Sequence, residues 1–392
     1  MRLAQRIEAV GPNAILALAA DCRRRQVMGQ RVVDLGLGEP DTPTPAHIVA
    51  AAARAAADGH TRYTPPAGIG ELRAAIVRGL AAEGLAYAPR EVMVSCGAMG
   101  ALGCAFLSLL EPGDEVLLPV PYYPSYLPQI GLAGGRPVAV PTDEASGFKL
   151  QPEALDRALT PRSRVLVLNA PSNPAGTVYT REELRALAAV ALQAGLTIVS
   201  DEVYRDLRAG PEELVSVAAL GLEARRHTLV VRSLSKSYAM TGWRIGYAAG
   251  PATLIQAMTR VQEALIVMPS SISQWAALEA LTGPQDCVRE LASSLEQRAA
   301  FVRQRLQAMP GVRCPPAGGT FFAFPALGAP GSDATALCAF LLDRHGVAVV
   351  PGREFGMPWC ARVSCAAPRA DLEEGLERME RGLVAGRHGH AA

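Results

Sequence analysis

A single lysine, Lys236, stands among small hydroxyl residues in the stretch RSLSKSYAMTGWRIGYAAG, which covers residues 232–250. Ser233 and Ser235 precede this lysine, and Arg244 follows it eight residues later. A lysine held in a dry pocket loses proton affinity and becomes a nucleophile that can form an imine with an aldehyde. Two hydroxyls and a forked, permanently charged guanidinium suit a phosphate dianion. Taken alone, the lysine is more simply explained as a solvated surface residue.

Three other apolar runs are also followed by residues that could bind a ligand. Asp201 follows the run LTIVS, with Tyr204 three residues later, and a carboxylate there is costly unless it has a cationic or hydrogen-bonding partner. Asn173 lies on a turn that follows VLVLNAPS. Gly97 follows EVMVSC and opens a helix, where exposed backbone N–H groups suit a phosphate. Each feature alone also has a structural explanation, as a buried salt bridge, a helix cap or an ordinary turn.

One ligand would satisfy all these positions together. An aldehyde would engage Lys236, and a phosphate would engage Arg244, the two serines and the turn at Gly97. A basic ring nitrogen would pair with Asp201, and a phenolate oxygen would face the asparagine and tyrosine. Pyridoxal 5'-phosphate carries all four groups. Ligands of open parallel sheets bind beyond the carboxyl ends of the strands, which is where these residues are expected.

The elements that must position these residues follow from alternating apolar runs and helical stretches. Five runs bounded by turns have the character of buried parallel strands: 91–97, 114–121, 163–174, 196–204 and 227–236. The stretch 180–195 predicts a crossover helix, with Thr180 as N-cap, Glu183 as its capping-box partner and Gly195 at its end. The pattern predicts an α/β fold, with a large doubly wound domain and a mostly parallel sheet.

The C-terminal part has a different pattern. A charged helical stretch leads into three short apolar runs and a final helix, which predicts a smaller α+β domain. We expect four parts along the chain: an N-terminal segment associated with the small domain (1–40), a large cofactor-binding domain (41–286), the small C-terminal domain (287–385) and a disordered tail (386–392).

Composition favours a small-molecule ligand. The 38 Lys and Arg residues nearly balance the 37 Asp and Glu residues, which leaves no field to attract nucleic acid or an anionic membrane. The eight cysteines are scattered, without a C-x-x-C pair or zinc spacing, as expected for thiols of a reducing cytoplasm. The N-terminus lacks the pattern of a signal peptide, and no apolar run reaches about 18 residues. We therefore expect a cytoplasmic protein with no nucleic-acid or membrane partner.

The chain resembles the class I aminotransferases of the aspartate aminotransferase superfamily, which are fold-type I pyridoxal-phosphate enzymes. Eight motifs carry the resemblance in the family's order: LGLGEPDTPTPAHI, TRYTPPAGIGELRAAI, EPGDEVLLPVPYYPSY, NAPSNPAGTVYT, SDEVYRDL, SLSKSYAMTGWRIGYAAGP, VVPGREFG and ARVSCAAP. The resemblance implies ping-pong transfer of an amino group from an L-amino acid to a 2-oxo acid. It also implies a homodimer with shared active sites.

The resemblance assigns cofactor roles residue by residue. Lys236 would form the Schiff base and carry the proton, and Asp201 would pair with the pyridinium nitrogen. Asn173 and Tyr204 would hold the ring hydroxyl oxygen, and the asparagine would also face the substrate. The phosphate would be held by Ser233, Ser235, Arg244, Gly97, Ala98 and Met99.

Four further residues match family positions. Tyr123 would cover the ring face, and Tyr63 would reach the phosphate of the other subunit's cofactor. Arg362 would clamp the substrate α-carboxylate with its planar fork, and Gly38 would lie in the loop that closes over the substrate. The chain departs from the family at Ala98, where many relatives have a hydroxyl or lysine, so backbone N–H groups must suffice there.

The sequence contains less evidence about the identity of the amino donor. The segments expected to line the side-chain pocket, 12–20 and 264–271, are apolar, and no basic residue can be assigned to a distal carboxylate. This favours neutral, aliphatic or aromatic donors over strictly aspartate, unless an arginine or lysine from elsewhere enters the pocket.

Two other classes of protein remain alternatives at the level of sequence. A lyase, a cyclising synthase or an oxidase on the same scaffold would use identical cofactor residues for another bond cleavage. A ligand-sensing regulator would need an attached DNA-binding module, and no basic helix-turn-helix precedes the core.

Overall fold

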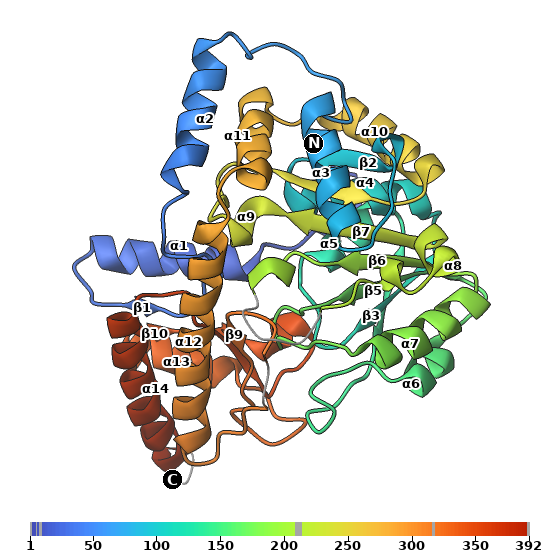
Figure 1. Cartoon of the computed structure of the whole chain (residues 1–392). Coiled ribbons are helices and arrows are strands. Elements are labelled where there is room, and N and C mark those ends of the chain that lie inside the picture. The colour runs from blue at the N-terminus through green and yellow to red at the C-terminus, as the bar shows by residue number, and fades with distance from the viewer. Residues whose placement is uncertain (1, 5, 8–9, 208–213, 316–317, 390–392) are drawn as a thin grey trace.

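A seven-stranded sheet crosses the larger part of the computed structural model, which describes residues 2–4, 6–7, 10–207, 214–315 and 318–389 (Figure 1). In spatial order its strands are β2 (Val92–Ser95), β8 (Gly246–Ala249), β7 (Thr228–Ser233), β6 (Thr197–Asp201), β5 (Ser163–Asn169), β3 (Glu115–Pro119) and β4 (Arg136–Val140). Only β8 runs antiparallel to its neighbours among these strands. The predicted mostly parallel sheet is confirmed, with the predicted runs at β2, β3, β5, β6 and β7.

Helices cover both faces of this sheet (Figure 1). They are α2 (Ala46–Ala57), α3 (Gly70–Ala82), α4 (Gly97–Leu109), α5 (Tyr126–Leu132), α6 (Pro152–Ala158), α7 (Arg181–Gln193), α8 (Leu222–Arg226), α10 (Ala252–Ile266) and α11 (Ser271–Thr282). Successive residues of a strand face opposite sides. Val165 and Val167 of β5 therefore pack in the cluster with α4 and α10, while Leu166 and Leu168 pack in the cluster with α7. Burial on both faces explains why the strands read as unbroken apolar runs.

The crossover helix α7 begins as its sequence predicts. The Thr180 hydroxyl accepts a hydrogen bond from the Glu183 N–H, and the Glu183 carboxylate accepts one from the Thr180 N–H at 2.7 Å. Gly195, just past the helix end, has a φ of +69°, which glycine adopts without the steric penalty of a Cβ. The predicted helix bounds are confirmed to within two residues.

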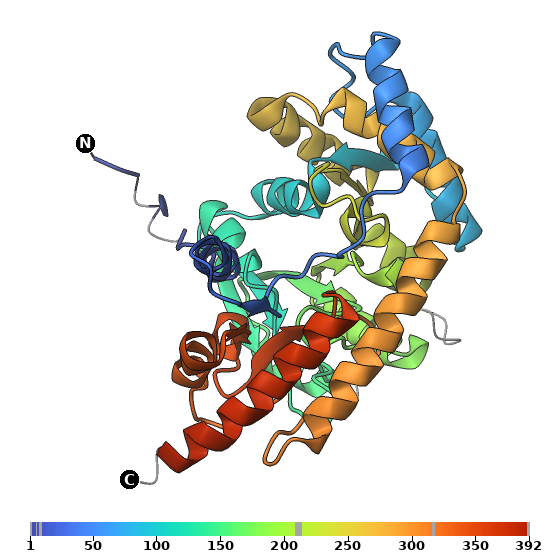
Figure 2. The ribbon, with the colours of Figure 1, turned by 90° about the vertical axis from the view of Figure 1, so that its left-hand side faces the viewer.

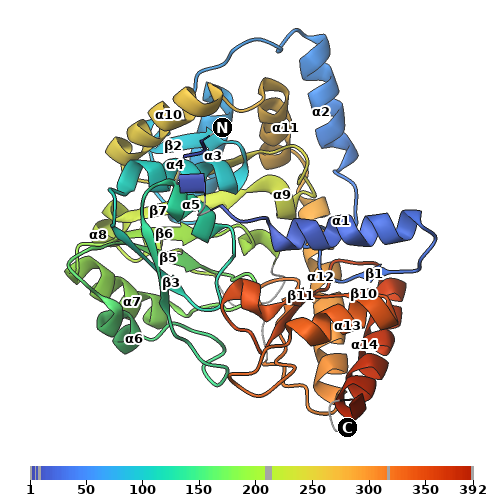
Figure 3. The same ribbon diagram turned by 180° about the vertical axis from the view of Figure 1, so that it is seen from behind.

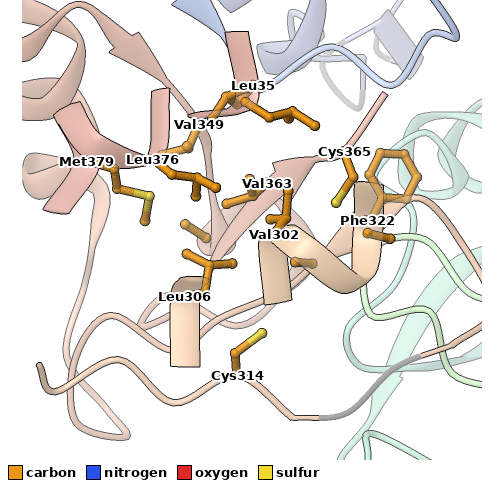
Figure 4. Close-up of a cluster of buried hydrophobic side chains, with 14 of the residues drawn as sticks. Leu35, Val302, Leu306, Cys314, Phe322, Val349, Val363, Cys365, Leu376 and Met379 are labelled. Carbon is orange, nitrogen blue, oxygen red and sulfur yellow. The ribbon is translucent and has the colours of Figure 1, made fainter. Parts of the chain in front are cut away.

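The C-terminal elements pack around a second core. They are α12 (Asp286–Ala308), α13 (Thr335–His345), α14 (Arg369–Gly389), β9 (Phe322–Ala323), β10 (Val347–Ala348), β11 (Val350–Pro351) and β12 (Ala361–Ser364). Figure 2 shows α12 and α14 lying side by side as two long helices. Between them, side chains such as Val302, Leu306, Val363, Leu376 and Met379 form the buried cluster of Figure 4. This core fixes the strand that carries Arg362.

The N-terminal segment joins these C-terminal elements. β1 (Val33–Asp34) pairs in parallel with β10, and α1 (Ala14–Val27) lies against β1 and β11 (Figure 3). The domain boundaries given from the sequence remain predictions. One detail differs: α14 continues to Gly389, past the expected start of a disordered tail at 386. Residues 390–392 lie outside the described part.

No helix among the described residues is long and apolar enough to cross a membrane.

Candidate active site

A cavity of about 150 Å³ opens at the carboxyl ends of β5, β6 and β7. Residues that follow a parallel strand leave the sheet at this edge. Their side chains can therefore face a ligand there. The cavity brings together ten of the residues singled out from the sequence: Ala98, Met99, Tyr123, Asn173, Asp201, Tyr204, Ser233, Ser235, Lys236 and Arg244. Gly97 directly precedes two of them at the start of α4.

Asp201 is a buried carboxylate at the floor of this cavity. The Tyr126 hydroxyl donates a hydrogen bond of 2.6 Å to Oδ2 of Asp201, and the Val203 N–H donates one of 3.3 Å to Oδ1. Burial raises the pKa of Asp201 to about 6, and these two hydrogen bonds oppose the rise. A buried carboxylate with no cationic partner is costly, so this site favours a ligand with a basic, protonatable atom.

Lys236 lies on the short helix α9 (Leu234–Ser237), directly after β7. Burial lowers the pKa of Lys236 to about 8, with smaller contributions from Arg362 and Arg244, while Glu39 opposes the change. Its Nζ donates a hydrogen bond of 2.5 Å to the carbonyl oxygen of Gly38. An amine with this pKa is substantially neutral near pH 8, and a neutral amine is both a nucleophile and a base.

An anion site lies at the start of α4. Gly97 has a φ of +68°, and a Cβ built on it would lie 2.8 Å from Nη2 of Arg244. Only glycine therefore lets the guanidinium approach the first turn of this helix. On the other side, the Ser233 hydroxyl donates a hydrogen bond of 2.9 Å to the Ser235 hydroxyl. Helix N–H groups, two hydroxyls and a guanidinium together form a donor set that fits a phosphate dianion.

Asn173 contacts both Tyr204 and Arg362 and so links the two sides of the site. Its Nδ2 donates a hydrogen bond of 3.3 Å to the Tyr204 hydroxyl, and its Oδ1 accepts one of 2.9 Å from Nη1 of Arg362. Asn169 in turn accepts a hydrogen bond of 2.7 Å from the Asn173 N–H. Two hydrogen bonds thus hold the side-chain amide of Asn173, and a third holds its backbone.

Arg362 is a fully buried cation that lacks an anion. Its guanidinium lies over the rings of Phe322 and Phe355, at 4.4 and 5.1 Å from their centres, and Nη2 donates to the Gly36 carbonyl at 2.6 Å. Within the described ranges, Arg362 forms no ion pair, and its Nε has no hydrogen-bond partner. Burial lowers its pKa to about 10, which leaves it charged at neutral pH. A carboxylate ligand would supply the missing charge and acceptor.

A second cavity, of about 190 Å³, continues from the first toward α1. The two cavities share Tyr123, Asn173, Tyr204 and Lys236. Gly38, Asn173 and Arg362 line the second cavity, so the three residues expected to bind substrate lie together there. Ring atoms of Phe322 would lie 2.7 Å from a Cβ at position 38, which explains the glycine.

Two sequence-based expectations are not tested by a single chain. Tyr63 has an exposed fraction of 85% and lines neither cavity. The segment 264–271, expected to line the side-chain pocket, contributes no residue to either cavity, whereas Asn13, Ile15 and Leu16 of the segment 12–20 do. The expectation for 264–271 therefore stays a prediction that concerns the shared site of a dimer.

Sequence reasoning missed five residues of the cavity: the polar residues Tyr126, Asn169 and Thr241, and the apolar residues Leu102 and Val203. Tyr126 could have been suspected as the third aromatic of the motif PYYPSY, and Asn169 as the last residue of a buried strand. Thr241 gives no signal of its own in the sequence. Its carbonyl oxygen accepts a hydrogen bond of 2.7 Å from Nη1 of Arg244.

Comparison with known proteins gives a consistent result. Residues 30–379 match the sequence model of the family described as "Aminotransferase class I and II". An aspartate aminotransferase of Geobacillus stearothermophilus is 43% identical over 393 residues, which cover 98% of this chain and 100% of that protein. The crystal structure of the Rhizobium meliloti aspartate aminotransferase has a TM-score of 0.93 at 39% identity, and covers 98% of this chain and 99% of its own. The Thermus thermophilus aspartate aminotransferase with maleate has a TM-score of 0.92 at 39% identity, with coverage of 97% and 100%.

Proposed function

Because this chain belongs to the class I and II aminotransferases, we propose that its two adjoining cavities form one active site, in which Lys236 moves the proton and Arg362 binds the substrate. The chain is a pyridoxal-phosphate-dependent aminotransferase of the fold-type I class. It transfers an amino group from an L-amino acid to a 2-oxo acid, and the relatives do not favour the lyase, synthase or oxidase alternatives. The match over nearly the whole chain likewise leaves no support for a regulator.

The residues of the first cavity fit the cofactor group by group. Bound pyridoxal phosphate supplies an electron-accepting ring that stabilises the charge left when an amino acid loses its α-proton. Asp201 would hold the ring nitrogen protonated, which relieves the cost of its own buried charge. Asn173 and Tyr204 would donate to the ring oxygen, and Tyr123 would cover the ring face. The phosphate would lie against Ser233, Ser235, Arg244 and the first-turn N–H groups of Gly97, Ala98 and Met99.

Lys236 would be both the group that binds the cofactor aldehyde and the base of the reaction. General bases work best when their pKa lies near the working pH, and burial brings Lys236 into that range. Its reach to the Gly38 carbonyl places Nζ at the boundary between the two cavities.

Arg362 would bind the α-carboxylate of the substrate through two parallel N–H donors, of which Nε is free in the described structure. Asn173 holds Nη1 and would fix the plane of the guanidinium. Gly38 lines the same cavity, and a Cβ there would lie 2.7 Å from the ring of Phe322 and 3.9 Å from Nη2 of Arg362.

We further infer that the enzyme is a homodimer with shared active sites. Tyr63 is the most exposed tyrosine named here, and Leu265, Ile266 and Val267 are exposed on the segment whose Met268 sulfur accepts a hydrogen bond from the Thr64 N–H. An exposed apolar group of this kind marks a protein contact, and a second copy would cover it. A cytoplasmic location is part of the same proposal, since all eight cysteines are free thiols.

The observation that carries this proposal is that one cavity joins a buried lysine of lowered pKa with a buried aspartate and an anion site. A half-reaction test follows: single amino acids are added to the cofactor-loaded protein, and the absorbance of the bound cofactor is recorded. The proposal requires that an amino acid converts the spectrum and that a 2-oxo acid restores it. Release of ammonia without an acceptor would instead indicate a lyase.

The chain contains two lysines, Lys149 and Lys236, so Lys149 serves as the control for Lys236. Lys149 pairs with Glu183 at 2.7 Å on α7, away from both cavities. Lys236→Ala should lower the rate by about two to four orders of magnitude, and Lys149→Ala should not. Borohydride reduction of the loaded protein should place the cofactor mass on the peptide with Lys236. A label on Lys149 would refute the assignment.

A further inference from the structure

The second cavity extends beyond Arg362 into an apolar space beside α1. Ile15 and Leu16 line it from the first turn of this helix, Leu37 lines it from the loop after β1, and Phe322 lines it from β9. Asn13, the N-cap of α1, is the polar side chain at this end. A substrate held at Arg362 by its α-carboxylate would place its own side chain in or near this space.

The wall formed by α1 is fixed by packing. Ile15 and Leu18 pack against the buried cluster that contains Val350 and Phe355, and Cys22 is buried farther along the same helix. Ile15 is therefore held by packing on the folded core, whereas Leu16 is an exposed part of the lining.

A second carboxylate would find little to neutralise it here. Lys236 and Arg362 are the cations among the residues that line this cavity, and both already have roles in the proposed reaction. Asn13 is uncharged: its side-chain oxygen accepts from the Leu16 N–H at 3.1 Å, and its Nδ2 could offer a carboxylate only a neutral hydrogen bond. The negative field of Glu39, which acts on Lys236, would also repel a second anion.

A lysine from a second copy of the chain cannot supply the missing charge, so an arginine of the partner is the one remaining source, and a preference for aspartate over apolar donors would reveal it. Lys149 is the only lysine besides Lys236, and it is held by Glu183. Ala98, at the first turn of α4, adds only a methyl group to the neighbouring cavity. Moving a carboxylate from water into such surroundings without a partner is strongly unfavourable, whereas an apolar side chain gains by burial.

We propose that this enzyme takes uncharged, apolar amino acids as its amino donors, and that Ile15 and Leu37 set this preference by lining the side-chain cavity. The inference rests on the proposed function and names its donor class. It separates this chain from the Geobacillus and Rhizobium enzymes, which are named for aspartate.

The first experiment compares donors on the cofactor-loaded wild type. Leucine, methionine and phenylalanine are each measured against aspartate and glutamate by the change in cofactor absorbance. The best apolar donor should have a kcat/KM at least about ten-fold above that of aspartate, the scale expected from differences in an apolar pocket.

A matched pair of variants on α1 tests the cause. Ile15→Lys places a cation in the cavity and should lower the leucine-to-aspartate ratio of kcat/KM by at least about ten-fold. Val27→Lys makes the same chemical change at the other end of the helix, at a side chain with an exposed fraction of 89%, and should leave the ratio unchanged. Equal ratios in both variants would refute the role of Ile15.

A binding measurement is independent of turnover and of variant folding. Calorimetry with the cofactor-loaded wild type compares 4-methylpentanoate, a monocarboxylate with an apolar tail, with succinate, a dicarboxylate of similar length. Tighter binding of 4-methylpentanoate is expected. Tighter binding of succinate, together with faster conversion by aspartate, would overturn the donor class and leave amino transfer intact. If no amino acid changes the cofactor spectrum, the proposed function and this inference fail together.

Discussion

The Tyr126 hydroxyl and the Asp201 carboxylate form a buried hydrogen bond of 2.6 Å that joins the start of α5 to the end of β6. The two residues lie 75 positions apart in the chain. This bond opposes the rise in the pKa of Asp201 that burial causes, and so favours the charged carboxylate that a protonated ring nitrogen requires.

Tyr126→Phe should shift the acid limb of the pH profile. Loss of the hydroxyl removes a hydrogen bond that favours the charged carboxylate, so the pKa of Asp201 rises further. The acid limb of kcat/KM should therefore move to higher pH, with a smaller effect well above it. Tyr122→Phe is the matched control, because Tyr122 lines neither cavity. An unchanged acid limb in Tyr126→Phe would contradict the assignment.

Asp201→Asn should stabilise the protein when the cofactor has been removed. Burial raises the folded-state pKa of Asp201 from 3.8 to about 6. The protonated carboxyl therefore makes its full contribution to stability below about pH 4, and this contribution is lost as the pH rises through 6. At pH 8 the variant should gain at most about 3 kcal/mol in free energy of unfolding, and the gain should shrink toward pH 4. Urea unfolding of both proteins at pH 4, 6 and 8 measures this. The loaded variant should nonetheless lose most of its activity.

Arg362→Lys should weaken substrate binding more than it slows turnover. Lysine keeps the positive charge but loses the planar fork and the stacking on Phe322 and Phe355. Loss of one charge-assisted hydrogen bond lowers kcat/KM by about 10- to 100-fold, mainly through KM. Arg353→Lys, at an exposed ion pair with Asp333, is the control that should change neither constant. An effect confined to kcat would argue against a carboxylate clamp.

Gly97→Ala should weaken cofactor binding. The new Cβ would lie 2.8 Å from Nη2 of Arg244, and the φ of +68° is itself unfavourable for alanine by about 1–2 kcal/mol. Displacement of the guanidinium should reduce the affinity for pyridoxal phosphate by at least about ten-fold. Equilibrium dialysis against the cofactor measures the change. Gly70→Ala, where a Cβ meets nothing within 4 Å, should bind the cofactor as the wild type does.

Local signals allowed much of the large domain to be predicted. Apolar runs identified five strands of the sheet, and residues at or just after the end of each run line one cavity. β8 was missed, because the sequence GYAA carries glycine and alanine in place of β-branched residues. The edge strand β4 was missed because it is mostly exposed and contains Pro137.

The sequence by itself determined which residues lie at the ends of buried strands. The apolar pattern of a strand and the turn that ends it both depend on residues that are neighbours in the chain. From these it predicted the cofactor groups, the fold class and the family. Tertiary structure alone decided that Arg362 meets Gly36, 326 positions away, and that α1 walls the cavity beside it. Such contacts arise from the packing of two separate cores against one another, and no local pattern specifies how remote surfaces will fit.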